Sequence, residues 1–250
     1  MGRIYSLSPD EIEILRLGRE NPDLITNYFF RPKGSEKGFV FDNNFAEWGR
    51  WQKMFHLADQ TRIVVIGGFG SGKTLCVAVS ASVWSMTTLD FKFMNAAPRA
   101  WQSELMYRLI MDLSEDTPFG KLIYECPRRP YPMIKLKFYV GQHLVNSSLE
   151  FMSVDKNASQ ILSWDGDWMN IDEAGLIDDL SDTIRNAGSR LRGVTKRGRP
   201  RLGRLSMCSN SWDNPELWYR YDMADSLPNE HLSITVSTRA NENITPEQLR

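Results

Sequence analysis

The eight residues from Gly67 to Thr74 read GGFGSGKT, a complete G-x-x-x-x-G-K-[ST] phosphate-binding loop. A β-branched run at 63–66 precedes this loop and an apolar stretch at 75–84 follows it, so the sequence predicts a strand, the loop and a helix in that order. Backbone amides of such a loop and the following helix N-terminus favour phosphate. Because a strand and a helix are predicted on either side of the loop, a glycine-rich turn that matches the motif by chance is disfavoured. The predicted nucleotide-binding residues of the loop are Gly67, Gly68, Phe69, Gly70, Ser71, Gly72, Lys73 and Thr74.

Lys73 and Thr74 have distinct expected roles in this loop. We expect Lys73 to contact the β- and γ-phosphates of ATP and Thr74 to hold Mg²⁺. A second element completes the prediction, because an apolar strand at 168–171 ends in Asp172 and Glu173. Asp172 is expected to meet the Mg²⁺, and Glu173 to orient and deprotonate the attacking water. Small GTPases lack this glutamate, so its presence favours the motor and helicase-like ATPases.

Two further elements fit an ATPase site. Gln52 lies shortly before the phosphate-loop strand, where helicase-like ATPases carry a glutamine that binds the adenine edge, although a surface glutamine on a helix is an equally open alternative. Ser209 and Asn210 end an apolar strand at 205–208. We expect this pair to sense the γ-phosphate and to pass its loss to the next segment.

The remaining patterns predict an α/β fold. Ser8-Pro9-Asp10-Glu11 forms a capping box, which predicts a helix that begins near residue 9. Further helices are expected at 45–57 and 101–113 and a strand at 91–95, and the alternating segments 134–140 and 149–154 predict an antiparallel hairpin. Strands that alternate with helices favour a mainly parallel central sheet with helices on both faces.

Composition limits the class of protein. The chain has 250 residues, of which 24% are charged and 42% apolar, as in an ordinary globular domain with one core and at most a small appendage. It contains no apolar run of the roughly eighteen residues that a membrane helix needs, and no apolar signal segment at its start. Its three cysteines show no paired spacing. We therefore expect a protein that stays in the cytosol and binds no membrane.

A basic stretch follows the acidic strand. Residues 190–204 contain seven basic side chains and no acidic one, and the glycines and prolines among them predict a loop. A solvated basic loop is the plain interpretation, and contact with nucleic-acid phosphates or with a neighbouring subunit's nucleotide is the functional one. The residues proposed from sequence to contact DNA are Lys196, Arg197, Arg199 and Arg201. The candidates for a catalytic arginine finger are Arg190 and Arg192, followed by Arg128 and Arg129.

The order of these elements resembles the ATPase domain of phage terminase large subunits, the motors that package viral DNA. The matching features are Trp51-Gln52, Gly67 to Thr74, Ala97-Pro98 with Gln102-Ser103, the hairpin, Asn170 to Gly175, Ser209-Asn210 and Ala240 to Thr245. Two positions depart from the family pattern. Phe69 stands where many terminases carry an arginine, and 162–165 lacks the family's Arg-Gly pair, so the arginine finger must come from elsewhere.

The resemblance implies a P-loop NTPase of the additional-strand, catalytic-glutamate type that uses ATP and Mg²⁺. It further implies a homo-oligomeric ring of subunits that translocates double-stranded DNA, with a portal protein and a small terminase subunit as partners in the cytoplasm of an infected host cell. We expect residues 1–210 to form the ATPase core with an N-terminal helical extension. Residues 211–250 are expected to form a small lid subdomain and the start of a linker to a C-terminal nuclease domain, because a helix that starts at Thr245 is cut at Arg250.

Two other functions remain open at this point. A helicase-like or replication ATPase would share both motifs, and a strand-separation element or a second ATPase domain would support it. A non-hydrolysing nucleotide-binding switch is the alternative from another class. Glu173 argues against the switch, because a switch does not need a catalytic base.

Overall fold

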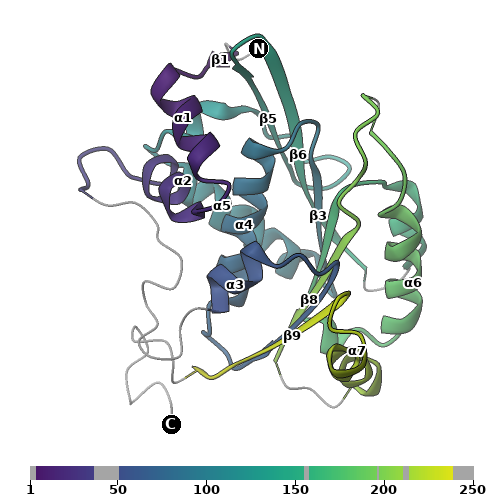
Figure 1. Ribbon diagram of the computed structural model, residues 1–250. Coiled ribbons are helices and arrows are strands. Elements are labelled where there is room, and N and C mark those ends of the chain that lie inside the picture. The colour runs from purple at the N-terminus through teal and green to yellow at the C-terminus, as the bar shows by residue number, and fades with distance from the viewer. Residues whose placement is uncertain (1–3, 37–50, 155–157, 196, 211–213, 239–250) are drawn as a thin grey trace.

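The computed structural model describes residues 4–36, 51–154, 158–195, 197–210 and 214–238. These residues form one sheet with helices packed against it (Figure 1). The strands are β1 (Tyr5–Ser6), β2 (Arg62–Gly67), β3 (Lys92–Ala97), β4 (Ile123–Glu125), β5 (Met133–Val140), β6 (His143–Ser153), β7 (Trp168–Asp172), β8 (Arg204–Ser209) and β9 (His231–Val236). The α-helices are α1 (Pro9–Leu17), α2 (Pro22–Phe29), α3 (Trp51–Leu57), α4 (Lys73–Thr87), α5 (Ala100–Ser114), α6 (Leu180–Arg190) and α7 (Pro215–Ser226).

The strand order confirms the predicted fold class. It runs β1-β5-β6-β3-β7-β8-β2-β9, with β4 paired to β5. All neighbours from β6 to β9 are parallel, and β5 and β6 form the expected antiparallel hairpin with a two-residue turn between Val140 and His143. Because β2, β8 and β7 are parallel, their last residues lie together at one end of the strands, which we call the carboxyl edge of the sheet. Their first residues lie at the opposite end, which we call the amino edge.

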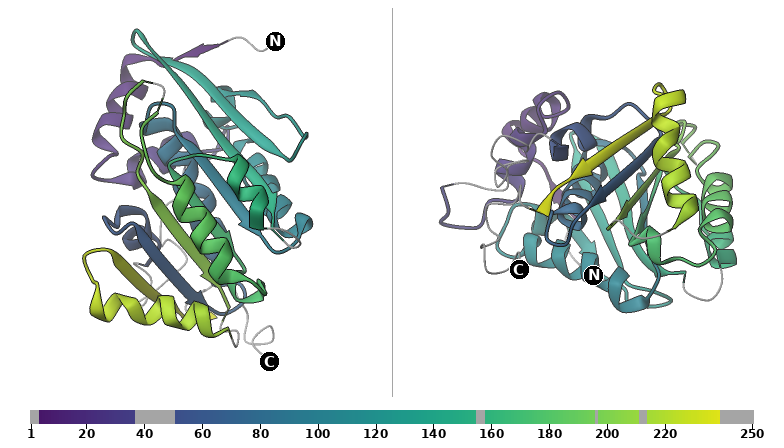
Figure 2. Two further views of the ribbon diagram at one scale, coloured as in Figure 1. Left: turned by 90° about the vertical axis from the view of Figure 1, so that its right-hand side faces the viewer. Right: turned by 90° about the horizontal axis from the view of Figure 1, so that it is seen from below.

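Helices cover both faces of the sheet, so its central strands are buried on both sides. One core cluster joins the sheet to α1 to α5, and a second joins it to α6 and α7. Figure 2 shows these two layers from two further directions. In β7, Trp168 packs in the first cluster while Met169 and Ile171 pack in the second. This two-sided burial explains why the central strands are continuous apolar runs instead of alternating ones.

The N-terminal helices follow their capping signals. The Ser8 hydroxyl accepts from the Glu11 amide at 3.2 Å, and the Glu11 carboxylate accepts from the Ser8 amide at 2.8 Å. This reciprocal pair starts α1 at Pro9, as predicted. The helix expected over 45–57 is present as α3 from Trp51, and its first part lies outside the described residues.

The expected lid subdomain needs a correction where the structure describes it. β9 pairs with β2 in parallel from Arg62 to Gly67, so it extends the main sheet instead of forming a separate layer over the site. Leu217 of α7 belongs to the same core cluster as α6. The apolar side chains of Ile234 and Val236 gain burial at the open edge of β2, and this long-range pairing is invisible in the local sequence. Residues 211–213 and 239–250, including the segments 240–245 and 245–248, lie outside the described residues.

Candidate active site

The phosphate loop lies at the carboxyl end of β2 and leads directly into α4. Gly70 and Gly72 have φ angles of 70° and 82°, which favour glycine because a side chain would be strained there. Gly68 has a different reason, since a β-carbon at this position would overlap the hydroxyl of Thr238. Its amide donates to the Val236 carbonyl at 3.3 Å. The end of β9 therefore supports the loop from one side, a contact that sequence reasoning missed.

Lys73 is buried and its amine is directed back into the loop. Its Nζ atom donates to the carbonyls of Gly67 at 2.8 Å and Gly68 at 3.0 Å, and to the side-chain oxygen of Asn210 at 3.1 Å. Burial lowers the pKa of Lys73, while neighbouring acidic groups act in the opposite direction. All three partners are oxygen atoms, and they accept the hydrogen bonds that phosphate oxygens would otherwise accept from the ammonium group.

Thr74 and Asp172 meet across the site, as the sequence predicts. The Thr74 hydroxyl donates to the Asp172 carboxylate at 3.2 Å, although the two residues come from α4 and β7. Burial, and then the charge of Glu173, raises the pKa of Asp172 to about 6. A hydroxyl and a carboxylate side by side fit Mg²⁺, which usually takes one or two carboxylates together with substrate phosphates and waters.

Glu173 adopts a left-handed backbone conformation with φ of 51°. Such a conformation costs about 1–3 kcal/mol for a residue with a side chain and is common at functional sites. The Asn210 amide lies 3.3 Å and 3.5 Å from the two carboxylate oxygens of Glu173. Asn210 therefore contacts both Lys73 and Glu173, which joins the phosphate loop to the expected catalytic base.

Ser209 and Asn210 occupy this position because of the strand order. β8 lies between β2 and β7, so its last residues emerge between the phosphate loop and the acidic pair. The Ser209 hydroxyl accepts from the Gly175 amide at 3.0 Å, just beyond Glu173. This is the arrangement in which an additional strand separates the phosphate-loop strand from the acidic strand.

Gln52 lies on α3 and is buried, so it is not the surface glutamine that the sequence left open. Its side-chain amide lies 3.5 Å from the Gly72 carbonyl of the phosphate loop. Contact of Gln52 with an adenine stays a prediction.

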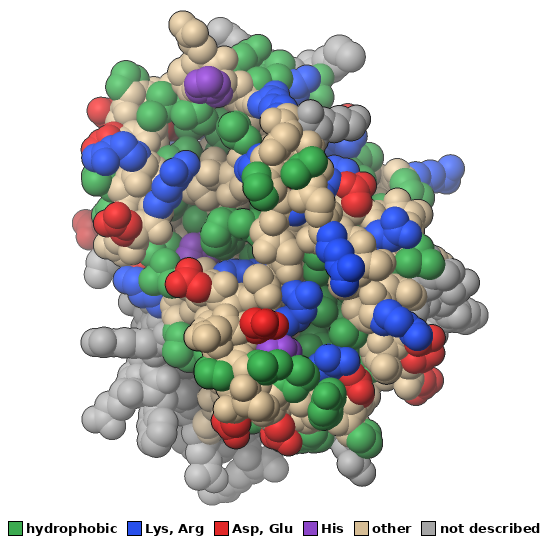
Figure 3. All heavy atoms as spheres, turned by 45° about the vertical axis from the view of Figure 1, so that its right-hand side comes forward, with side chains coloured by type: hydrophobic (Ala, Val, Ile, Leu, Met, Phe, Trp, Pro, Cys, Tyr) green, Lys and Arg blue, Asp and Glu red, His purple; other side chains and the backbone are tan. Residues whose placement is uncertain are grey.

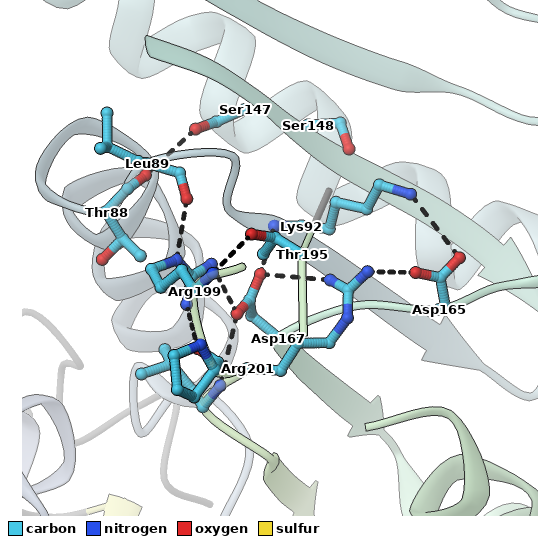
Figure 4. Close-up of polar contacts among 12 residues, drawn as sticks. Thr88, Leu89, Lys92, Ser147, Ser148, Asp165, Asp167, Thr195, Arg199 and Arg201 are labelled. Atoms are coloured by element: carbon cyan, nitrogen blue, oxygen red, sulfur yellow. Dashed lines mark hydrogen bonds and ion pairs between the residues drawn. The ribbon is translucent and has the colours of Figure 1, made fainter. Parts of the chain in front are cut away.

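The basic stretch folds over the amino edge, away from the phosphate loop. Val194 and Pro200 form an antiparallel bridge, and the fully buried Asp167 accepts from Arg199 at 2.7 Å. Asp167 also pairs with Arg201 at 3.5 Å, and Arg201 extends to Asp165 (Figure 4). The charges of Arg199 and Arg201 are thus paired with carboxylates of the chain itself, and their contact with DNA stays a prediction.

The other predicted DNA contacts differ in their placement. Arg197 is more exposed and pairs with Asp90 at 3.3 Å, and Lys196 lies outside the described residues. Figure 3 shows basic side chains spread over the face that carries α6, together with acidic ones. The face is therefore mixed in charge.

Arg190 and Arg192 also belong to the amino edge. The Arg190 carbonyl accepts from the Gly166 amide at 3.2 Å, just before β7 begins. The five residues of β7 separate that point from Glu173, a length of about 17 Å at roughly 3.3 Å per residue. Neither arginine is brought to the site of its own chain, so a finger role would have to act on a neighbouring subunit. Arg128 pairs with Glu104 at 3.0 Å.

Within the described residues, no helix is long and apolar enough to cross a membrane. Neither the protein-family models nor the curated proteins that were compared with the sequence give a match. Several solved structures, by contrast, share the fold of this chain.

The large terminase ATPase domain of Thermus phage P74-26 superposes with a TM-score of 0.54 at 15% identity, over 74% of this chain and 79% of that one. The large terminase of bacteriophage HK97 gives a TM-score of 0.58 at 13% identity, over 85% of this chain and 43% of that one. The large terminase of a thermophilic bacteriophage gives 0.57 at 14% identity, over 79% of this chain and 47% of that one. The chain thus spans less than half of the two longer proteins, and it has the fold of the ATPase domain of phage large terminases.

Proposed function

We propose that this chain is the ATP-hydrolysing motor domain of a viral genome-packaging terminase. The observation that carries the proposal is the contact of Asn210 with both Lys73 and Glu173, beside the pair Thr74 and Asp172. These side chains come from distant parts of the sequence and meet at one edge of the sheet, which supports a site where a lysine, a metal-binding pair and a water-orienting carboxylate act together. The similar terminase of a thermophilic bacteriophage has been solved with ADP and with ATP-γ-S, which supports nucleotide binding here.

Each side chain has a role that follows from its place. Lys73 exchanges its carbonyl partners for the β- and γ-phosphates, and the loop amides of 67–74 surround them. Thr74 and Asp172 would hold Mg²⁺, and the ion would supply positive charge to neutralise the phosphates. Glu173 orients and deprotonates the attacking water, a role worth about 10²–10⁴ in rate. In this proposal, Gln52 and Phe69 contact the bound nucleotide.

We further propose that ATP hydrolysis by this domain is coupled to the movement of DNA. The support for this coupling is the likeness to terminase ATPase domains together with exposed basic side chains of the amino edge, such as Arg192 and Arg197. The working assembly would be a homo-oligomeric ring on a portal protein, with a small terminase subunit and double-stranded DNA as partners. It would act in the cytoplasm of the infected host cell.

Two alternatives predict different measurements. A helicase-like ATPase would be stimulated most by single-stranded nucleic acid, whereas a packaging motor would be stimulated by double-stranded DNA. A non-hydrolysing switch would bind nucleotide and release no phosphate. The position of Glu173, one residue beyond the expected metal ligand Asp172, favours hydrolysis over the switch.

The deciding experiment is a phosphate-release assay with double-stranded DNA, single-stranded DNA or no nucleic acid. Release that rises with double-stranded DNA and disappears in Lys73→Ala supports the proposal. Glu13→Gln, at an exposed site on α1, is the control and should leave release unchanged. Binding of ATP without any release by the parent protein would contradict the proposal.

A further inference from the structure

The backbone turn after Glu173 is held from two sides. The Glu173 carbonyl accepts from the Leu176 amide at 2.9 Å, which closes a short turn through Gly175. The Gly175 amide donates to the Ser209 hydroxyl at 3.0 Å. The Gly175 carbonyl, on the other side, accepts from the side-chain amide of Asn214 at 3.3 Å.

Asn214 makes three contacts with its one side chain. Its amide nitrogen also donates to the Ile177 carbonyl at 3.3 Å, at the end of the same turn. Its oxygen accepts from the Leu217 amide at 3.2 Å, which caps the N-terminus of α7. An asparagine is suited to both tasks because its side chain carries a donor and an acceptor on one carbon atom.

The segment that Asn214 begins returns to the phosphate loop. The Tyr221 hydroxyl of α7 lies 2.6 Å from the Thr235 hydroxyl of β9. The Val236 carbonyl, at the end of β9, accepts from the Gly68 amide at 3.3 Å. The unit of α7 and β9 therefore contacts the turn after Glu173 at its start and the phosphate loop at its end.

We propose that Asn214 is a positioning residue that holds Glu173 through the turn 174–177 and links this turn to α7. The proposal rests on the proposed function, since it assigns Glu173 the catalytic role. The left-handed backbone of Glu173 is strained, and such a conformation persists only where the surrounding contacts enforce it. Loss of the Asn214 donor would let the turn relax and move the carboxylate. A displacement of about 1 Å at a reacting group can reduce turnover about a hundredfold.

Asn214→Asp separates the two tasks of this side chain. Aspartate is as good a helix cap as asparagine, and its charge suits a helix N-terminus, so α7 stays capped. Its carboxylate has no hydrogen to donate, however, and would repel the carbonyls of Gly175 and Ile177. We expect kcat for ATP to fall about ten- to a hundredfold, with KM nearly unchanged and the melting temperature lowered by about a few degrees through the two lost hydrogen bonds.

Asp179→Ala is the matched control. Asp179 caps the neighbouring helix α6 through the Asp182 amide at 3.2 Å, and no described contact joins its side chain to the turn 174–177. This variant loses a cap, which should lower the melting temperature, and it should keep kcat. If Asn214→Asp keeps kcat, or if both variants lower kcat in step with their melting temperature, the proposal is wrong.

A double-mutant cycle and hydrogen exchange complete the test. In a Glu173→Gln background, Asn214→Asp should lower kcat no further, because both changes act through one carboxylate; full additivity would contradict the proposal. The amides of Gly175, Leu176 and Ile177 should exchange about tenfold faster in Asn214→Asp, while those of α7 stay protected. If the parent protein hydrolyses no ATP, the proposed function fails, and the exchange measurement alone decides whether Asn214 holds the turn; unchanged exchange overturns it.

Discussion

The side-chain amide of Asn210 lies 3.3 Å from the carboxylate of Glu173. The oxygen of the same Asn210 side chain accepts from Lys73 at 3.1 Å. One amide therefore contacts the residue expected to meet the γ-phosphate and the residue expected to activate water. If Lys73 exchanges Asn210 for a phosphate, the side chain of Asn210 is released and its contact with Glu173 changes. The expected coupling role of Asn210 would act through these two contacts.

Glu173→Gln should keep nucleotide affinity and lose about two to four decades of turnover. The glutamine preserves the size of the side chain and a hydrogen bond with Asn210, but it cannot take a proton from water. Nucleotide titration and phosphate release on the same preparation provide the two measurements. Turnover at the parental rate would show that another group is the base.

Gly68→Ala should weaken nucleotide binding by about tenfold or more. The new methyl group would overlap the Thr238 hydroxyl, so either the phosphate loop or the end of β9 must shift, and overpacking of this kind typically costs about 1–3 kcal/mol. Gly188→Ala is the control, because a β-carbon there meets no atom within 4 Å. Equal nucleotide affinities of the two variants, measured by titration, would contradict the role assigned to β9.

Asp167→Asn should destabilise the fold by about 3 kcal/mol, because it leaves two arginines without their buried carboxylate. Asp167 is fully buried and also accepts from the Lys92 amide at 3.1 Å. Asp165→Asn removes an exposed partner of Arg201 and should cost less than about 1 kcal/mol. Denaturant unfolding of both variants tests the difference, and equal losses would show that the buried pairs do not anchor the basic stretch.

Acid should destabilise the protein through His56. Burial, and then the charge of Arg204, lowers the pKa of His56 to about 3. The unfolded chain binds this proton at about pH 6.5, so the unfolded state holds more protons below that pH. The stability that neutral His56 contributes is complete above about pH 6.5 and is lost as pH falls toward 3, by about 1.4 kcal/mol per unit. Unfolding free energies measured from neutral pH down into the acid range should fall less steeply in His56→Gln.

Arg190→Ala and Arg192→Ala test the arginine finger across a subunit interface. A finger that acts in trans makes turnover rise steeply with protein concentration, and its loss should remove about 10³–10⁵ of the assembled rate while nucleotide affinity holds. A DNA-contacting arginine would instead weaken DNA binding in a salt-dependent way. If hydrolysis by the assembled protein is unchanged in both variants, neither residue is the finger, and Arg128 and Arg129 become the next candidates.

The features that sequence predicted are those encoded within a few residues. The Ser8 capping box and the strand, loop and helix around Lys73 each depend on neighbours in the chain, and the structure confirms them. Asp172 also met Thr74, because the carboxyl ends of parallel strands share one edge. The placement of the motifs therefore follows from the fold class.

The features that sequence missed depend on pairing between distant segments. The pairing of β9 with β2 joins residues far apart in the chain, so an edge strand looked like a separate lid. Asp167 lies before β7 and belongs to no sequence motif that would single it out. Its carboxylate nevertheless pairs with Arg199 and Arg201. Asn214-Pro215 does signal a helix start, but its contact with the turn after Glu173 needs the folded backbone.

The contacts of Lys73 with its own loop make phosphate binding an exchange reaction. An arriving nucleotide must compete with the carbonyls of Gly67 and Gly68 for the ammonium, so the site gains only the difference between two sets of hydrogen bonds. That difference grows with the negative charge of the incoming phosphate chain. Because the same two contacts are given up for a triphosphate and for a diphosphate, they lower the affinity for both nucleotides by the same factor, and they would form again when the product leaves.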